Sequence, residues 1–67
     1  MQNTIKVERA ILDITQEELA QQIGVSRQTI NSIEKNRYVP STVLALRISA
    51  LFKKTVNEIF VLDDADA

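Results

Sequence analysis

Apolar residues recur with helical spacing in several short stretches of the chain. In residues 15–23, Leu19, Ala20 and Ile23 stand at i, i+1 and i+4, on one side of a helix. The only glycine of the chain, Gly24, follows directly, and glycine readily adopts the positive φ with which many helices end. The pattern predicts a short amphipathic helix that stops at this glycine.

A second short helix is predicted just after the glycine. Ser26 is a favoured N-cap residue, and Ile30 and Ile33 share one face behind it. At about 100° per residue the opposite face is polar, with Arg27 exposed in the first turn. This outer face carries Gln28, Asn31, Ser32 and Lys35. Two helices joined in this way are typical of a helix-turn-helix DNA-binding motif.

Three more helices flank this pair. Residues 5–12 are predicted to form a first helix, capped by Asn3 or Thr4. Its apolar positions are Ile5, Ile11 and Leu12. A fourth helix follows Pro40, which disfavours helix at the residue before it, and Ser41 is its cap. The apolar stripe of the fourth helix is Leu44, Ala45, Ile48, Leu51 and Phe52.

Capping boxes mark two of the helix starts. Thr15 with Glu18 opens the helix of residues 15–23, and Thr55 with Glu58 opens a short fifth helix. The fifth helix leads into an apolar run that could end as a strand. This run is Ile59, Phe60, Val61 and Leu62.

The composition of the chain limits the kinds of chemical site that it can form. The chain has 67 residues, enough for one domain, and contains neither cysteine nor histidine. Disulfides and thiolate zinc sites are therefore excluded, and the commonest metal ligand and general base is missing. We expect no cofactor, no metal and no small-molecule ligand. With no run of about 18 apolar residues and no secretory leader pattern, we expect a soluble cytoplasmic protein that does not bind membranes.

The net charge of −1 conceals a basic region. Three aspartates stand in residues 63–67. Without them the chain has eight basic and six acidic residues, a net charge of +2. Arg27, Lys35 and Arg37 gather around the outer helix. A local basic face of this kind suits a DNA partner.

The chain resembles the Xre or phage Cro/repressor type of helix-turn-helix regulator over nearly its whole length. The matching segments are residues 15–20, Gly24, residues 25–30 and 33–34, Tyr38, and residues 40–41. The resemblance implies an all-α, five-helix lambda-repressor-like domain over residues 1–62, with short strands from the chain ends, and an acidic tail at 63–67. Residues 27–35 and 57–60 are most similar to the short cytolysin-repressor-like members, which act as homodimers.

The resemblance also implies roles for single residues. Gln16 would contact a phosphate from the first turn of its helix, and the outer face would enter the major groove. The residues expected at double-stranded DNA are Gln16, Ser26, Arg27, Gln28, Thr29, Asn31, Ser32, Lys35, Asn36, Arg37 and Tyr38. Arg9 and Glu34 would pair and fix the position of the outer helix. Two exposed charges are the alternative for that pair.

The side chains of the outer face suit base recognition. Arg27 can donate twice to guanine, and Gln28 can pair with adenine. Asn31, Ser32 and Lys35 share the face and would touch either bases or only phosphate and water. A solvated helix face is the alternative for all five.

Two positions near this face have competing interpretations. Gln16 stands where the free N–H groups of a helix start can meet a phosphate, and its alternative is a simple exposed residue. Tyr38 either joins Arg37 in a phosphate clamp or packs its ring under the fourth helix, and packing is the favoured interpretation.

The chain departs from the family pattern at a few positions. Asp13 and Lys53 replace residues that are usually glycine, and Asn36 is another departure, in the turn after the outer helix. Glu8 stands where relatives often carry leucine. Asp and Asn tolerate the left-handed region better than Lys does.

Together these features predict a sequence-specific transcriptional regulator, and a repressor in particular. Its homodimer would form through Ile59, Phe60, Val61 and Leu62, with a contribution from residues 2–4. An antitoxin-like module that binds a protein partner and touches DNA secondarily is the alternative. An enzyme is disfavoured because histidine and cysteine are absent and the carboxylates cap helices or lie in the tail.

Overall fold

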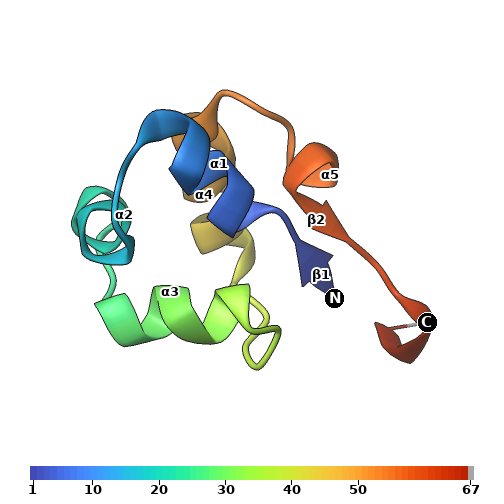
Figure 1. Cartoon of the computed structure of the whole chain (residues 1–67). Helices are drawn as coiled ribbons and strands as arrows, with labels where there is room; N and C mark the ends of the chain where they lie inside the picture. The colour runs from blue at the N-terminus through green and yellow to red at the C-terminus, as the bar shows by residue number, and fades with distance from the viewer. Residues whose placement is uncertain (67) are drawn as a thin grey trace.

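A computed structural model describes residues 1–66, which form five helices and a two-stranded sheet (Figure 1). The helices are α1 (Ile5–Leu12), α2 (Gln16–Ile23), α3 (Arg27–Glu34), α4 (Thr42–Phe52) and α5 (Val56–Ile59). The strands are β1 (Gln2–Asn3) and β2 (Phe60–Val61), followed by a 3-10 turn, η1 (Asp64–Asp66). The all-α, five-helix prediction with short terminal strands is confirmed.

The predicted caps begin four of the helices. Thr15, Ser26, Ser41 and Thr55 each accept a hydrogen bond from the backbone N–H three residues further on. At Thr15 and Thr55 the glutamate in that third position also accepts from the N–H of the cap, at 2.9 Å in both boxes. Each cap satisfies N–H groups that have no partner inside the helix, which fixes where the helix begins.

Residues with positive φ turn the chain after four helices. Gly24 has φ 78° after α2, as predicted. Asp13 (φ 55°) ends α1, Lys53 (φ 56°) ends α4, and Asn36 (φ 60°) lies in the turn after α3. These side chains therefore adopt the turn geometry that glycine would supply at lower cost. The cost is largest for Lys53, because Asp and Asn tolerate this region better.

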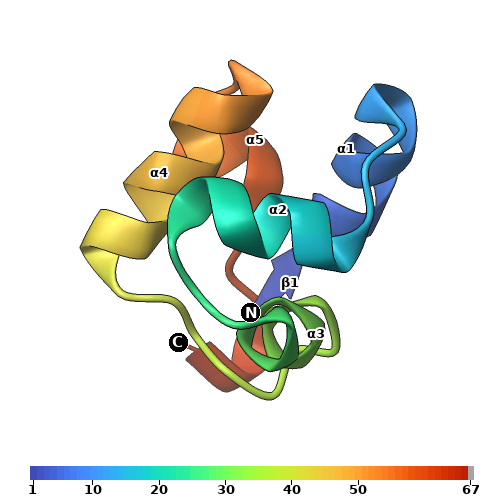
Figure 2. The same cartoon turned by 90° about the vertical axis from the view of Figure 1, so that its left-hand side faces the viewer.

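The core lies where the inner faces of the helices meet. Its fully buried side chains are Ile5, Leu19, Ile30, Ile33, Ile48 and Ile59. Ala20, Ile23, Leu44, Phe52 and Phe60 complete it. Figure 2 shows α3 end-on at the lower edge of the molecule, with α2 above it. One side of α3 is therefore in the core, while its other side faces solvent.

α1 contributes little apolar surface to the core. Ile5 is buried, but Ile11 and Leu12 are exposed, so the apolar positions predicted for this helix do not make a buried face. The hydroxyl of Thr4, in the N-cap position, makes no cap bond. Oδ1 of Asn3 accepts the N–H of Ile5 at 3.2 Å instead. Of the two residues proposed as caps from the sequence, Asn3 therefore supplies the side-chain bond.

The C-terminal run is only partly available to another chain. β2 pairs antiparallel with β1, with Gln2 opposite Val61 and Asn3 opposite Phe60. Ile59 and Phe60 are buried in their own chain, whereas Val61 and Leu62 are exposed. Dimerisation through these four residues stays a prediction; intrachain packing already covers Ile59 and Phe60 and leaves Val61 and Leu62 accessible.

The acidic tail folds back onto the first residue. The amine of Met1 lies 3.1 Å from Asp63 and 2.9 Å from Asp66. Hydrogen bonds to Asp66 and Asp63 raise the pKa of this amine, while the pKa of Asp66 is lowered by the N–H of Asp63 and then by the amine. The predicted tail of 63–67 extends to Ala67, which lies outside the described residues.

Candidate nucleic-acid interface

The outer face of α3 is polar, as the spacing predicted. Ile30 and Ile33 are buried, and Arg27, Gln28 and Lys35 are exposed. Thr29, Asn31 and Ser32 are half-buried at the sides of the helix. At 1.5 Å per residue, eight residues make a rod of about 12 Å, a length that reaches a few base pairs of a major groove.

Two open hollows of the molecular surface flank this face. One, of about 430 Å³, is lined by Arg9, Asp13, Ile14, Thr15, Gln16, Glu17 and Arg27. The other, of about 290 Å³, is lined by Ser26, Gln28, Thr29, Ser32, Arg37 and Tyr38. The exposed ridge of α3 thus has a depression on each side, with Gln16 lining one and Arg37 the other, two side chains that can meet a phosphate.

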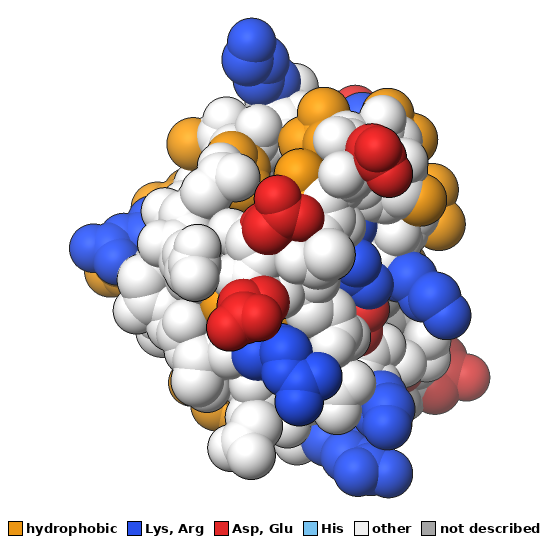
Figure 3. Space-filling view, turned by 60° about the vertical axis from the view of Figure 1, so that its left-hand side comes forward, with side chains coloured by type: hydrophobic (Ala, Val, Ile, Leu, Met, Phe, Trp, Pro, Cys, Tyr) orange, Lys and Arg blue, Asp and Glu red, His pale blue; other side chains and the backbone are white. Residues whose placement is uncertain are grey.

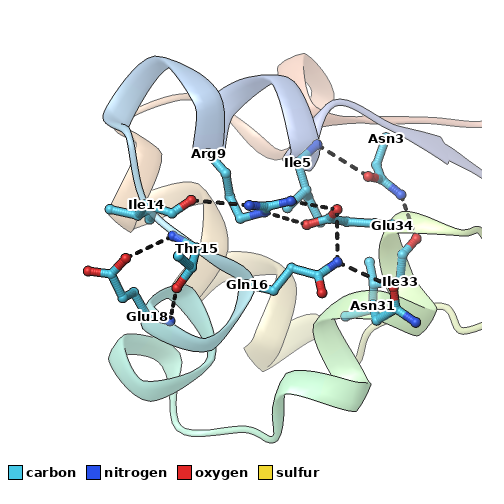
Figure 4. A network of polar contacts seen from close by, with 10 residues as sticks. All are labelled: Asn3, Ile5, Arg9, Ile14, Thr15, Gln16, Glu18, Asn31, Ile33 and Glu34. Carbon is cyan, nitrogen blue, oxygen red and sulfur yellow. Dashed lines mark hydrogen bonds and ion pairs between the residues drawn. The ribbon is translucent and has the colours of Figure 1, made fainter.

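A polar network holds α3 in place against α1 and α2 (Figure 4). Nε of Arg9 donates to Oε2 of Glu34 at 2.6 Å, and a second guanidinium nitrogen donates to Oε1 at 3.1 Å. The third nitrogen donates to the carbonyl of Ile14 at 3.1 Å. The hydrogen bond to Glu34 raises the pKa of Arg9. The predicted Arg9–Glu34 pair is thereby confirmed.

Gln16 belongs to the same network. It lies in the first turn of α2, at the edge of the larger hollow. Its amide nitrogen lies 3.3 Å from Oδ1 of Asn31 and 3.3 Å from Oε1 of Glu34, and it donates to both. In the free protein this side chain therefore ties the start of α2 to α3, a role that the sequence did not indicate.

A second ion pair fastens α1 on its other side. Nζ of Lys54 lies 2.7 Å from Oε2 of Glu8, whose side chain is only 8% exposed. Ser49 Oγ donates to the carbonyl of Lys54 and so fixes the turn that carries the lysine. The departure from leucine at Glu8 is therefore compensated by a partner 46 positions away, which no local pattern could reveal.

The loop after α3 places its polar side chains beside the helix. The N–H of Asn36 donates to the carbonyl of Ile33 at 3.0 Å, and that of Arg37 to the carbonyl of Ser32 at 2.9 Å. Tyr38 is 47% exposed and lines the smaller hollow beside α3. The favoured prediction that its ring packs under the fourth helix is therefore wrong, because the loop directs Tyr38 toward α3.

Charge is distributed unevenly over this face. Figure 3 shows several Lys and Arg side chains in its lower part, with Asp and Glu side chains above them, and further Lys and Arg side chains at the top and the left edge. Arg27 at the start of α3, Lys35 at its C-cap and Arg37 in the following loop are all exposed. Basic side chains thus lie at both ends of the polar face of α3.

Comparisons with known proteins agree with this geometry. The family model described as helix-turn-helix matches residues 5–59. The chain belongs to the helix-turn-helix family of DNA-binding transcriptional regulators. This match confirms the Xre-type resemblance, and the family consists of transcription regulators rather than enzymes. Within residues 1–66, no helix is long and apolar enough to cross a membrane, and no group of three acidic residues could hold a metal ion.

Several relatives share almost the full length of the chain. An uncharacterized HTH-type transcriptional regulator of Methanothermobacter thermautotrophicus is 48% identical over 68 residues, covering 100% of this chain and 99% of the relative. A counterpart in Methanocaldococcus jannaschii is 47% identical over 64 residues, 96% of this chain and 97% of the relative. An uncharacterized HTH-type transcriptional regulator of Bacillus subtilis is 42% identical over 64 residues, 96% of this chain and 97% of the relative.

Proposed function

We propose that this helix-turn-helix regulator is a sequence-specific repressor that binds an inverted-repeat operator as a homodimer. The observation that carries the proposal is the exposed polar ridge of α3 between two hollows, one lined by Gln16 and the other by Arg37. A helix of this size fills a major groove, and the phosphate backbones on its two sides then meet the hollows.

The face of α3 divides into base-reading and phosphate-binding positions. Arg27 and Gln28 lie in the first turn of α3, the part that approaches base edges in this motif. Gln16 and Arg37 lie in different hollows on the two sides of α3 and are the proposed phosphate ligands. The remaining proposed contacts are Ser26, Thr29, Asn31, Ser32, Lys35, Asn36 and Tyr38.

An exposed apolar region supports the homodimer. Val39, Leu46, Val61 and Leu62 are each more than half exposed. Val39 and Leu46, with the buried Phe60, also border a groove of about 210 Å³. A second copy would remove this surface from water and present two copies of α3 to successive turns of one DNA face, with half-sites about 10 base pairs apart.

Repression requires only that this dimer occupy its site. A dimer on an operator of two half-sites covers about two turns of duplex and excludes other proteins from it. Such a mode of action uses the DNA-reading face and the apolar region and needs no additional activity.

Selection of bound fragments from random-sequence DNA tests the proposal. The selected site should be an inverted repeat, and Gln28→Ala should bind the best site about 5- to 100-fold more weakly while relaxing preference at one position per half-site. If parent and Gln28→Ala rank a panel of single-base variants identically, Gln28 does not read a base. A parent protein that selects no sequence would favour the antitoxin-like alternative.

A charge-matched pair of variants tests the phosphate contacts. Arg37→Ala should weaken binding to all sequences alike and lower the slope of affinity against salt by about one unit. Lys53→Gly removes one positive charge at the turn between α4 and α5, far from α3 in Figure 1, and should leave that slope unchanged. Equal slopes for parent and Arg37→Ala would contradict the contact.

A further inference from the structure

Asn3 connects the terminal sheet to the end of α3. Its side-chain nitrogen donates to the carbonyl oxygen of Ile33 at 2.8 Å and to Oδ1 of Asn36 at 3.2 Å. Its side-chain oxygen accepts the N–H of Ile5 at 3.2 Å. Figure 4 shows this amide between the start of α1 and the end of α3. One residue of β1 thus contacts α1, α3 and the loop after α3.

The bond to Ile33 acts as a cap for α3. Carbonyl groups in the last turn of a helix have no intrahelical partner. The carbonyl of Ile33 receives one bond from the N–H of Asn36 at 3.0 Å and a second from Asn3, which is 30 positions away in the chain. The second bond is partly buried, so water does not readily replace it.

A second contact ties the same strand to the loop. The side-chain Nδ2 of Asn36 donates to Oε1 of Gln2 at 3.1 Å. Asn36 has a positive φ, so its backbone is in a conformation that non-glycine residues adopt reluctantly without support. The two residues of β1 therefore support both the last turn of α3 and the turn that carries Arg37.

We propose that Asn3 is a positioning residue for DNA recognition. The two hydrogens of its amide are engaged by Ile33 and Asn36, so its role is to hold the end of α3 rather than to contact DNA. Because Asn3 stands opposite Phe60 in the sheet, formation of the β1–β2 pair and correct placement of α3 are coupled. This inference rests on the proposed DNA-reading function.

The test uses Asn3→Ser in the full chain. Serine is neutral and keeps a short acceptor for the N–H of Ile5, but its side chain is too short to reach Ile33. Affinity is measured for the duplex that the parent selects from random-sequence DNA. Loss of the two bonds should weaken binding roughly 3- to 10-fold. The slope against salt should stay at the parent value, because no charge is removed.

A matched control separates positioning from general stability. Ser41→Ala removes the N-cap bond of α4, a loss of similar size in a helix that is not adjacent to either strand in the chain. It should bind the selected duplex as the parent does at a temperature where both are folded. Amide hydrogen exchange supplies a readout without DNA. In Asn3→Ser, protection of the Asn36 and Arg37 amides should fall several-fold, while that of Gly24 stays at the parent value.

Each outcome decides the proposal. Weaker binding by Asn3→Ser together with parent-like binding by Ser41→Ala supports it. Parent-like binding by Asn3→Ser, or an equal loss in Ser41→Ala, overturns it. If the parent selects no DNA, the proposed function fails separately, and exchange then decides whether the link exists. Unchanged protection of Asn36 and Arg37 would refute the link, and reduced protection would support it.

Discussion

Removing one partner of the Arg9–Glu34 ion pair should strongly destabilise the fold. The side chains of Arg9 and Glu34 are only 15% and 7% exposed, and two hydrogen bonds of 2.6 and 3.1 Å join them. Arg9→Ala leaves the Glu34 carboxylate with Gln16 as its remaining partner. Glu34→Ala leaves the Arg9 guanidinium with the carbonyl of Ile14.

The magnitude follows from this burial. Breaking a fully buried pair costs about 3–5 kcal/mol, and exposed pairs contribute about 0–1 kcal/mol. Because both side chains have low exposure, each single substitution should lower the free energy of unfolding by about 2–4 kcal/mol. Arg9→Ala should be the costlier, because it strands the more deeply buried charge. At about 4–8 °C per kcal/mol for a chain of this size, each substitution should lower Tm by at least about 8 °C.

Urea unfolding of four variants measures the effect. Arg9→Ala and Glu34→Ala should each shift the midpoint far below the parent, while Arg9→Met/Glu34→Leu should recover much of the loss, because it strands no charge. Glu17→Ala removes an exposed carboxylate from α2 and should cost less than about 1 kcal/mol. Single variants that unfold at the parent midpoint would show that the pair contributes nothing and that α3 is fixed by packing alone.

Three further changes have defined outcomes. Leu62→Glu, at a position 74% exposed, should dissociate the proposed homodimer in sedimentation at tens of micromolar; a parent that already sediments as a monomer contradicts that dimer. Lys53→Gly relieves a positive φ of 56° and should raise the urea midpoint, by up to about 1 kcal/mol, whereas a lower midpoint would show that the lysine is unstrained. Hydrogen bonds from Thr55 lower the pKa of Glu58, so its stabilising effect is complete above the usual pKa and is lost as pH falls through the lowered value. The difference in stability between parent and Glu58→Gln should therefore shrink between about pH 7 and pH 3, and a constant difference would contradict the charged cap.

Local signals made much of the fold predictable. Thr15 with Glu18 and Thr55 with Glu58 form the capping boxes expected of them, and Gly24 has the positive φ expected. The division of α3 into an apolar and a polar face also follows directly from its spacing. These features depend on residues within one helical turn of each other, so the sequence contains all the necessary information.

Features that depend on distant partners were not predictable in this way. The burial of Glu8 requires Lys54, and the capping of α3 requires Asn3, and neither partner is near in sequence. The exposure of Ile11 and the direction of Tyr38 depend on how α1 and the loop after α3 sit against the core. Apolar spacing identifies a helix but does not say how much of its surface the neighbouring helices cover.

The way in which α1 is attached to the rest of the domain affects its behaviour on heating. Ile5 is its one fully buried apolar side chain, and two ion pairs, through Glu8 and Arg9, provide the other main attachments. The cost of desolvating charged groups falls as temperature rises, whereas the stabilisation from apolar burial levels off. α1 should therefore keep its attachment on warming, although little of its apolar surface is buried. Exchange of the Glu8 amide, which donates to the carbonyl of Thr4 at 2.9 Å, would report early release of this helix if apolar contact alone governed it.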